Sequence, residues 1–350
     1  MKRLAMTGKG RVEVLEYDER ALESGEVRVK TEIASGKHGT SLAILDGVNF
    51  SGVRFDQNRR LFLDGNGSPS HLASREKPLN LGTTAVGTIT EVAPDVTGLA
   101  VGDRVFGLMD IRATNTAAAA ELWQLGDLDP LNVLCIEPAY VSFHAIREAG
   151  VRIGDKVAVV GLGAIGLIAV AMCRQAGAEQ IIAVDPIEPR RTLAKQLGAS
   201  DVVEPTVAGG GDVAEAIHEL TGGPGVDVSI ECAGRYDALD SAIRSTRVAG
   251  TVSAAGFYQG EASSLWLGRE WHHNRLSMIV PHGCGWGHPP RDFPRWDSSR
   301  AYDAVVSLMR QERLDVSDII QPVISIDRGP DVYRMMIEEP QKTVKFAVEF

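Results

Sequence analysis

The sequence predicts an α/β protein with two domains, one built around a doubly wound parallel sheet and one around antiparallel strands. The residues 156–185 read as a strand, a glycine turn, a helix and a second strand that ends on Asp185. After Asp185, short apolar runs alternate with helical runs, which is typical of a parallel sheet. Residues 1–29 and 81–107 instead alternate short β-runs with turn signals, which indicates antiparallel pairing.

Length and composition narrow the classes of protein and partner. A chain of 350 residues exceeds the usual size of one hydrophobic core, so two domains are expected. The net charge of −10 argues against nucleic acid or an anionic membrane as a partner. The four cysteines are scattered without a C-x-x-C, which predicts neither a disulfide framework nor a cysteine-built zinc site. No apolar leader or membrane-spanning run is present, so we expect a cytoplasmic protein.

The segment 49–78 interrupts the antiparallel part of the chain. It is polar, contains several Gly, Arg and Ser residues, and shows little regular period. Loops of this length in a compact domain are usually functional or mobile. Two interpretations stay open, a solvated surface insertion and a loop that covers a substrate. Further on, residues 137–149 predict a helix that leads into the glycine turn.

A buried strand runs directly into that turn. Residues 157–160 form a short apolar run of the kind found in strands covered on both faces. The run breaks at a G-x-G-x-x-G motif whose glycines are Gly161, Gly163 and Gly166. Apolar residues at helical spacing follow from Ile165 to Ala176, and Gly177 is a natural helix stop.

This order of elements is that of a dinucleotide-binding βαβ unit. Gly161 allows the tight turn, Gly163 lets a pyrophosphate approach the backbone, and Gly166 lets the helix pack closely on the strand. The diphosphate would lie on the first N–H groups of the helix, at Ala164 and Ile165. A purely structural glycine turn is the alternative.

The acid at the end of the second strand indicates which dinucleotide binds. Asp185 is placed to accept hydrogen bonds from the adenosine ribose and would repel a 2′-phosphate, so we expect NAD as the cofactor. Arg190 and Arg191 could soften this preference by offering cations, and Arg190 is a candidate cofactor contact.

After Asp185, predicted strands and helices alternate as far as residue 256, and the pattern then becomes irregular. Residues 271–297 break the rhythm with His, Gly, Pro and Trp. A terminal strand–helix–strand segment from residue 321 onward is expected to complete the amino-terminal domain. The predicted helices are 190–199, 212–223, 236–250 and 301–314, and the predicted strands are 201–205, 226–234 and 250–256.

Four segments together resemble the medium-chain dehydrogenase/reductase superfamily of zinc alcohol and sorbitol dehydrogenases. They are GDRVFG at 102–107, the stretch from Glu137 to Gly166, AVDPIEPRRTLAKQLGA at 183–199 and VDVSIECAG at 226–234. The resemblance covers almost the whole chain. It implies a GroES-like β-barrel catalytic domain (1–148 and 286–350), a Rossmann NAD-binding domain (149–285), an active site between them and a cofactor contact at Ala233.

The metal pattern of that family does not carry over. Where the family has the ligand segment C-G-[ST]-D, this chain has His38-Gly39-Thr40-Ser41, and where it has G-H-E, this chain has Gly82-Thr83-Thr84. Glu137 matches the acidic position at the third-ligand region, so His38 and Glu137 remain as possible ligands, and the four-cysteine loop of the structural zinc is missing. Threonine is not a competent replacement for a zinc ligand. We therefore predict that no metal is bound; a site rebuilt with His71 or another histidine is the alternative.

A metal-free alcohol dehydrogenase needs another group to handle the proton of the hydroxyl. His38 is the candidate, because imidazole titrates near neutrality and the resemblance places it at a ligand position. Thr40 matches the family's proton-relaying hydroxyl, Glu137 would orient His38, and Lys37 is an alternative acid. A histidine merely packed in the barrel is the competing interpretation, and Thr83 and Thr84 are expected to be strand hydroxyls satisfied by the backbone.

The tryptophans and histidines of residues 266–296 suit stacking on a sugar or cyclitol, although a subunit interface is an equal alternative. The sequence therefore predicts an NAD-dependent, zinc-independent oxidoreductase for a secondary hydroxyl of a sugar-like, cyclitol or polyol substrate. A zinc-free enone or quinone reductase and a non-catalytic nucleotide-binding protein are the alternatives. The resemblance also implies a homodimer or homotetramer, paired through edge strands within residues 250–279.

Overall fold

The computed structural model describes residues 1–37, 53–64, 73–205, 212–281 and 291–350 of the chain. The chain divides into two compact units. Unit 1 comprises Met1–Gln124, Pro322–Pro340 and Phe346–Phe350, and unit 2 comprises Leu125–Gln321 and Gln341–Lys345. These bounds differ from those of the predicted catalytic and nucleotide domains, whose division by function stays a prediction.

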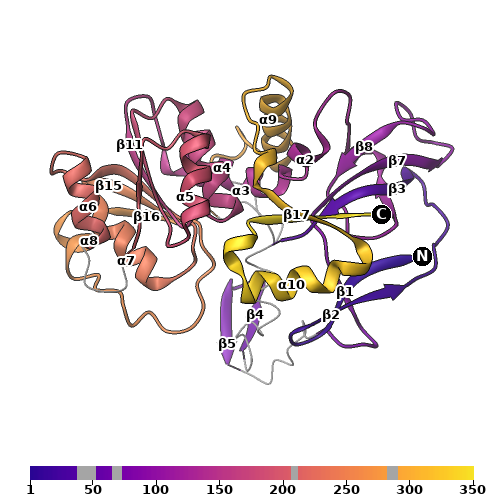
Figure 1. The fold of residues 1–350 in the computed structure, drawn as a ribbon, viewed down its shortest axis with the longest axis horizontal. Helices are drawn as coiled ribbons and strands as arrows, with labels where there is room; N and C mark the ends of the chain where they lie inside the picture. Colours follow the sequence, from indigo (N-terminus) through magenta and orange to yellow (C-terminus); the bar gives the residue numbers. More distant parts are fainter. Residues whose placement is uncertain (38–52, 65–72, 206–211, 282–290) are drawn as a thin grey trace. The chain divides into compact units, whose positions relative to one another are not determined.

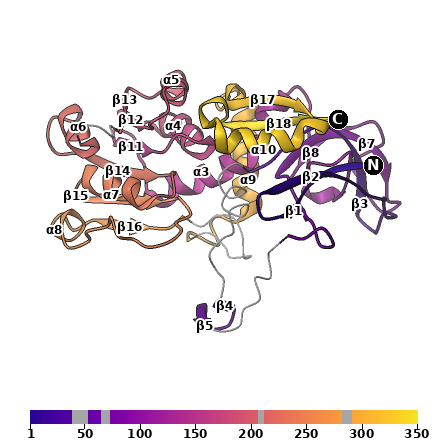
Figure 2. The ribbon, with the colours of Figure 1, turned by 60° about the horizontal axis from the view of Figure 1, so that its bottom comes forward.

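In the described part of unit 2, six parallel strands form one sheet in the order β13-β12-β11-β14-β15-β16, which can be followed in Figure 2. The strands are β11 (Lys156–Val160), β12 (Gln180–Val184), β13 (Asp201–Val203), β14 (Val226–Glu231), β15 (Thr246–Ala254) and β16 (Ser277–Ile279). The order reverses between β11 and β14. In doubly wound sheets, ligands bind at the carboxyl ends of the strands beside such a reversal.

The helices of unit 2 pack on this sheet or on one another. They are α2 (Pro130–Val133), α3 (Ile136–Ala149), α4 (Ala164–Ala176), α5 (Glu188–Leu197), α6 (Val213–Leu220), α7 (Tyr236–Ser245), α8 (Glu270–His273) and α9 (Ser298–Arg310), with a short 3₁₀ turn η2 (Ser317–Ile319). Helix α4 packs against α3 and α5, whereas α6 packs against α7, and Figure 1 shows α4 and α5 apart from α6, α7 and α8. Helix α4 ends before Gly177, as predicted.

The central strand β11 is covered on both faces, which confirms the prediction from its apolar run. Val157, Ala158 and Val159 are fully buried, and Val160 is 4% exposed. Ala158 and Val160 lie in a cluster with apolar residues of β12, β14, α6 and α7, such as Ile182. Burial on both sides holds the strand in place, and with it the position of the turn that follows.

Unit 1 is mainly antiparallel. In its described part, β10-β8-β7-β3-β18-β17 form one sheet, to which β9 is added by pairing with β3, and β2-β1-β6 form a second. The strands are β1 (Lys2–Gly8), β2 (Arg11–Glu16), β3 (Glu26–Ser35), β6 (Leu79–Asn80), β7 (Thr84–Val92), β8 (Arg104–Gly107), β9 (Thr114–Ala118), β10 (Leu122–Gln124), β17 (Ile320–Ser325) and β18 (Lys345–Glu349). The short helices are η1 (Ala119–Glu121), η3 (Ile326–Arg328), α10 (Gly329–Glu338) and η4 (Pro340–Lys342).

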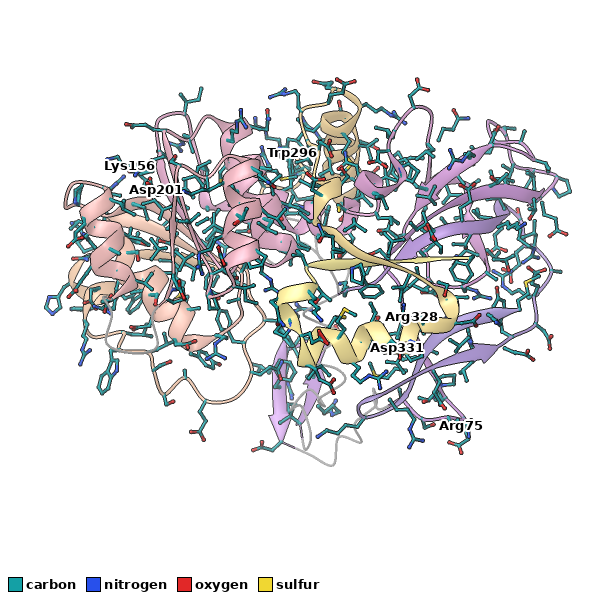
Figure 3. The ribbon with its side chains drawn as sticks, in the orientation of Figure 1. Arg75, Lys156, Asp201, Trp296, Arg328 and Asp331 are labelled. Atoms are coloured by element: carbon teal, nitrogen blue, oxygen red, sulfur yellow. The ribbon has the colours of Figure 1, made fainter. Side chains whose placement is uncertain are left out.

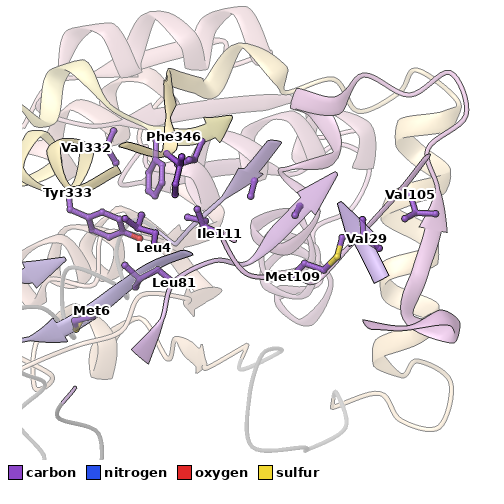
Figure 4. Close-up of a cluster of buried hydrophobic side chains, with 14 of the residues drawn as sticks. Leu4, Met6, Val29, Leu81, Val105, Met109, Ile111, Val332, Tyr333 and Phe346 are labelled. Carbon is purple, nitrogen blue, oxygen red and sulfur yellow. The ribbon is translucent and has the colours of Figure 1, made fainter. Parts of the chain in front are cut away.

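The carboxyl-terminal strand completes the sheet of unit 1, as predicted. Ala347 of β18 is registered opposite Ser35 of β3, and the Ser35 hydroxyl donates to the Phe346 carbonyl at 2.6 Å. Figure 4 shows Phe346 and Tyr333 of α10 packed in one cluster with Leu4 and Ile111. Residues from both ends of the chain therefore build one core.

Three segments depart from the sequence predictions. Helix α7 stops at Ser245, not at residue 250, because the β-branched Thr246 and Val248 enter β15. Residues 271–297 are less irregular than expected, since they contain the end of α8 and the sheet strand β16. Part of 49–78 forms a hairpin of β4 (Val53–Asp56) and β5 (Leu61–Asp64). The function of that segment stays open.

Among the described residues, we find no helix with the length and apolar character that a bilayer crossing requires.

Candidate functional site

The turn after β11 is pressed against the turn after β14. Gly161 has a φ of 92°, a conformation that residues with a side chain rarely adopt. A Cβ added to Gly161 would lie 2.6 Å from the nitrogen of Ala233. Its N–H donates to the Val184 carbonyl at 2.8 Å, which ties the turn to β12. Both the conformation and the contact exclude a side chain at Gly161.

The two other glycines of the motif differ from each other in their surroundings. A Cβ on Gly166 would overlap the Gly161 carbonyl oxygen, so α4 packs against the turn only because residue 166 has no side chain. A Cβ on Gly163 would meet no described atom within 4 Å beyond its chain neighbours. The fold of the described residues therefore requires glycine at 166 but leaves open space at 163.

That open space lies at the amino end of α4. Gly163 is the N-cap of the helix, and no side chain caps it. The first N–H groups of the helix, including those of Ala164 and Ile165, carry the positive end of the helix dipole. An anionic diphosphate fits this arrangement, since a helix amino terminus with unhindered backbone is a ready anion site.

Asp185 is buried, with 4% of its surface exposed, and it faces the glycine turn. Its Oδ2 accepts the Leu162 N–H at 2.7 Å, and its Oδ1 accepts the Ile187 N–H at 2.8 Å. Each carboxylate oxygen can accept a further hydrogen bond. The carboxylate is therefore held at the carboxyl edge of β12 and retains acceptor capacity for a ribose hydroxyl.

The two arginines beyond Asp185 are held by partners of their own. Arg190 lies with its Nη1 at 3.9 Å from Asp185 Oδ2, and it donates to the Thr343 carbonyl at 3.0 Å. Burial lowers the pKa of Arg190, and Asp185 opposes that shift. Arg191 donates to the Asp185 carbonyl at 2.7 Å and to Glu204 at 2.9 Å. Both side chains serve to fix the loop after β12.

The sequence analysis missed a second acid at the same edge of the sheet. Glu231, the last residue of β14, is fully buried. Its Oε1 accepts the N–H groups of Ala233 at 2.8 Å and Gly234 at 2.9 Å, and its Oε2 accepts the hydroxyl of Tyr258. The signal was available, because Glu231 ends a buried strand much as Asp185 follows one.

The structure describes two of the four predicted catalytic residues. His38 and Thr40 lie outside the described residues. Lys37 follows β3 in unit 1, and Glu137 lies in the first turn of α3 in unit 2; both are half-buried. The roles of these four residues in proton transfer stay predictions.

The two threonines that replace the family's metal-binding segment differ in their hydrogen bonds. The Thr83 hydroxyl donates to the Ser35 carbonyl at 3.2 Å, so the backbone satisfies it as expected, although β7 begins only at Thr84. The Thr84 hydroxyl is buried and has no hydrogen-bond partner among the described residues, so that expectation was wrong for Thr84. Within the described ranges, no three His, Cys, Asp or Glu side chains gather as a metal site. His38 and His71 lie outside those ranges, and the zinc prediction stays a prediction.

The described tryptophans of residues 266–296 do not share one location. Trp271 packs against the core of the parallel sheet. Trp296, labelled in Figure 3 just before α9, packs instead with Tyr140. The guanidinium groups of Arg147 and Arg300 lie 4.1 Å and 4.2 Å from the centre of the Trp296 ring. These cations occupy ring surface that a sugar would need for stacking.

Known proteins that this chain resembles are named as dehydrogenases. Residues 164–296 match the family model described as zinc-binding dehydrogenase. The chain is 33% identical to D-guloside 3-dehydrogenase of Escherichia coli (strain K12) over 356 aligned residues, which cover all of both chains. It is 31% identical to scyllo-inosose 3-dehydrogenase of Thermotoga maritima over 57% of this chain and 48% of the relative.

The fold has close structural counterparts as well. The crystal structure of 2R,3R-butanediol dehydrogenase from Bacillus subtilis matches with a TM-score of 0.76 at 24% identity, covering 100% of this chain and 99% of the other. The architecture is thus a GroES-like β-barrel catalytic domain with a Rossmann nucleotide domain. The chain belongs to the zinc-binding dehydrogenase family of the medium-chain dehydrogenase/reductase superfamily, and it is an oxidoreductase of the alcohol and polyol dehydrogenase type.

Proposed function

We propose that the protein is an NAD-dependent, zinc-independent dehydrogenase that oxidises a secondary hydroxyl of a sugar-like, cyclitol or polyol substrate, or reduces the matching ketone. The observation that carries the proposal is the glycine turn at α4, with open space at Gly163 and the carboxylate of Asp185 beside it. Two relatives named as dehydrogenases of a guloside and an inosose support the substrate class.

The residues of unit 2 fit a bound nicotinamide dinucleotide. Gly161 and Gly166 let the turn and the helix pack closely, Gly163 leaves open space for the diphosphate, and the first turn of α4 offers N–H donors. Asp185 would accept a ribose hydroxyl, and its buried negative charge disfavours a 2′-phosphate in the same place. Arg190 and Arg191 are the nearby cations that a 2′-phosphate would need. Both already have partners in Asp185, Thr343 and Glu204, which favours NAD over NADP.

The chemistry requires the removal of one hydride and one proton from a CH–OH group. A bound nicotinamide supplies the hydride acceptor. In our proposal, an imidazole nitrogen of His38 takes the hydroxyl proton, Thr40 relays it and Glu137 orients the imidazole. Lys37 is the alternative acid.

The proposed independence of zinc rests on residue chemistry. Thr83 and Thr84 stand where the family has a histidine ligand and its neighbouring acid, and a hydroxyl of threonine does not bind zinc in such sites. The residues present do not fit the family's catalytic zinc, and the proposed mechanism uses none. We also propose a homo-oligomer, a small molecule as the main partner, and a reducing, cytoplasmic location in keeping with the scattered cysteines.

A substrate panel tests the proposal. The purified protein would be offered glycosides, cyclitols, linear polyols, enones and quinones, each with NAD or NADP, and nicotinamide reduction or oxidation would be followed by absorbance. We expect turnover of at least one ring polyol or glycoside with NAD. Turnover confined to enones or quinones would identify the protein as a zinc-free reductase instead, and no turnover together with tight dinucleotide binding would contradict the proposed catalysis.

A further inference from the structure

The strand order of unit 2 divides the dinucleotide site into two halves. The acid that would hold the adenosine ribose, Asp185, follows β12 on one side of β11. The diphosphate would lie at α4, directly after β11. A dinucleotide that extends across the reversal of strand order must therefore place its nicotinamide half beside β14 and β15.

The three turns at this edge touch one another. Gly161 of the first turn leaves no room for a side chain against Ala233 of the second. In the second turn, a Cβ on Gly234 would lie 3.0 Å from the carbonyl oxygen and 3.1 Å from the nitrogen of Phe257. A Cβ on Gly256 of the third turn would in turn overlap Gly234. A shift in any one turn would move its neighbour.

Glu231 joins the second and third turns through both its side chain and its backbone. The side chain holds the N–H groups of Ala233 and Gly234 and the hydroxyl of Tyr258. The backbone carbonyl accepts the N–H of Ala255 at 2.9 Å and of Gly256 at 3.0 Å. Burying a carboxylate costs free energy unless hydrogen-bond donors surround it. The donors around Glu231 offset that cost, and the bonds they form fix both turns.

We propose that Glu231, together with Tyr258, is a positioning residue for the nicotinamide half of the cofactor site. It fixes the turns after β14 and β15 so that their backbone presents one surface to the ring. The inference rests on the proposed binding of NAD and adds a second residue to the site. Asp185 binds the adenosine half of the cofactor, and Glu231 positions the turns that contact the nicotinamide half.

The test compares NADH with ADP-ribose, which lacks only the nicotinamide. Affinities of both ligands would be measured by calorimetric titration on the full chain. Glu231→Leu removes the acceptor of two N–H groups and one hydroxyl. Because the turns after β14 and β15 would lose these hydrogen bonds, we expect NADH to bind at least roughly tenfold more weakly while ADP-ribose binding stays within about twofold.

Three further variants separate positioning from general stability. Glu231→Gln keeps an acceptor for both N–H groups and a polar partner for Tyr258, so it should retain most of the NADH affinity. Tyr258→Phe removes one hydrogen bond and should weaken NADH alone, by about threefold to tenfold. Asp227→Asn is the matched control at the opposite end of β14, where Asp227 pairs with Arg247 at 2.6 Å. It should lower the melting temperature without changing either affinity.

The outcomes are distinct. Equal losses for NADH and ADP-ribose in Glu231→Leu, or no loss for either, would overturn the inference. If Glu231→Leu does not fold, a folded Tyr258→Phe with unchanged NADH affinity would overturn it as well. A wild-type protein that binds neither NADH nor ADP-ribose would instead contradict the proposed function.

Discussion

At the scale of single residues, Asp185 makes the most direct prediction about cofactor choice. The wild-type protein should bind NADH at least about tenfold more tightly than NADPH, because a 2′-phosphate would bring roughly two negative charges to a buried carboxylate. Titration by nicotinamide fluorescence would measure both affinities. AMP and its 2′-phosphorylated form serve as fragment controls and should show the same order. Equal or tighter binding of NADPH would contradict this role for Asp185.

His38 is the residue on which the proposed acid/base chemistry depends. His38→Ala and His38→Asn should both lower the rate of the chemical step by about 10²–10⁴-fold, since neither side chain can carry the proton. Single-turnover kinetics would measure that step. NADH affinity is the control and should stay unchanged, because the proposed dinucleotide contacts lie in unit 2. A folded His38→Asn protein with full activity would transfer the role to Lys37 or Glu137.

Glu231 also predicts a dependence of stability on pH. Burial raises the pKa of this carboxyl group, although the hydrogen bonds from Tyr258, Gly234 and Ala233 oppose the shift. Burial also raises the pKa of Tyr258 and of Cys232. A raised pKa in the folded state means that the stability from Glu231 is full below its unfolded pKa. That stability is lost as the pH rises through the folded value.

The comparison with Glu231→Gln isolates this effect, because glutamine does not titrate. From about pH 4 to about pH 8, the melting temperature of the wild-type protein should fall relative to that of Glu231→Gln. Differential scanning fluorimetry of the two proteins in matched buffers measures the difference. A wild-type protein that gains stability relative to the variant over this range would show that the folded-state pKa is lowered instead.

At the scale of elements, the glycine turn offers a paired prediction. Gly166→Ala would force a Cβ onto the Gly161 carbonyl, so both the melting temperature and the NADH affinity should fall. Gly163→Ala meets open space and has a φ of −72°, so it should fold with nearly unchanged stability but bind NADH about tenfold or more weakly. A Gly163→Ala protein with normal NADH affinity would support a purely structural turn.

The same scale shows why the sequence predicted some elements and not others. Helix α4 and strand β11 follow from local patterns, since the apolar run and the glycines carry their own signals. The end of α7 could not be read in the same way. The helical spacing continues past Ser245, whereas pairing of Thr246 with Val226 on β14 draws the chain into the sheet. Contacts between distant strands therefore override the local pattern there.

The candidate site was predictable to the extent that its motif is contiguous. Asp185 and the glycines lie within one stretch, and the structure places the acid against the turn. Glu231 was missed because its importance depends on Tyr258 and on the backbone of Ala255, which only the fold brings to it. The place of Glu231 on a β-run is visible in the sequence, whereas these contacts are not.

At the scale of the whole molecule, the replacement of the family's ligands predicts a protein without stoichiometric zinc. Elemental analysis of the purified chain should find well under one zinc per chain, and chelators should leave activity unchanged, because Thr83 and Thr84 stand in place of a ligand and its neighbouring acid. A metal-supplemented preparation is the control. Close to one zinc per chain with activity lost on chelation would contradict the prediction and make His38 and Glu137 the first suspected ligands.

The pairing of β18 with β3 also sets an order of events during synthesis. Strand β18 follows β11 to β16 in the chain, so the ribosome makes all of these strands before it. Because domains fold as units once their residues are available, the parallel sheet can form on the nascent chain while residues 33–35 of β3 still lack their partner strand. A polypeptide released before β18 would carry all six strands of the parallel sheet and an unfinished barrel.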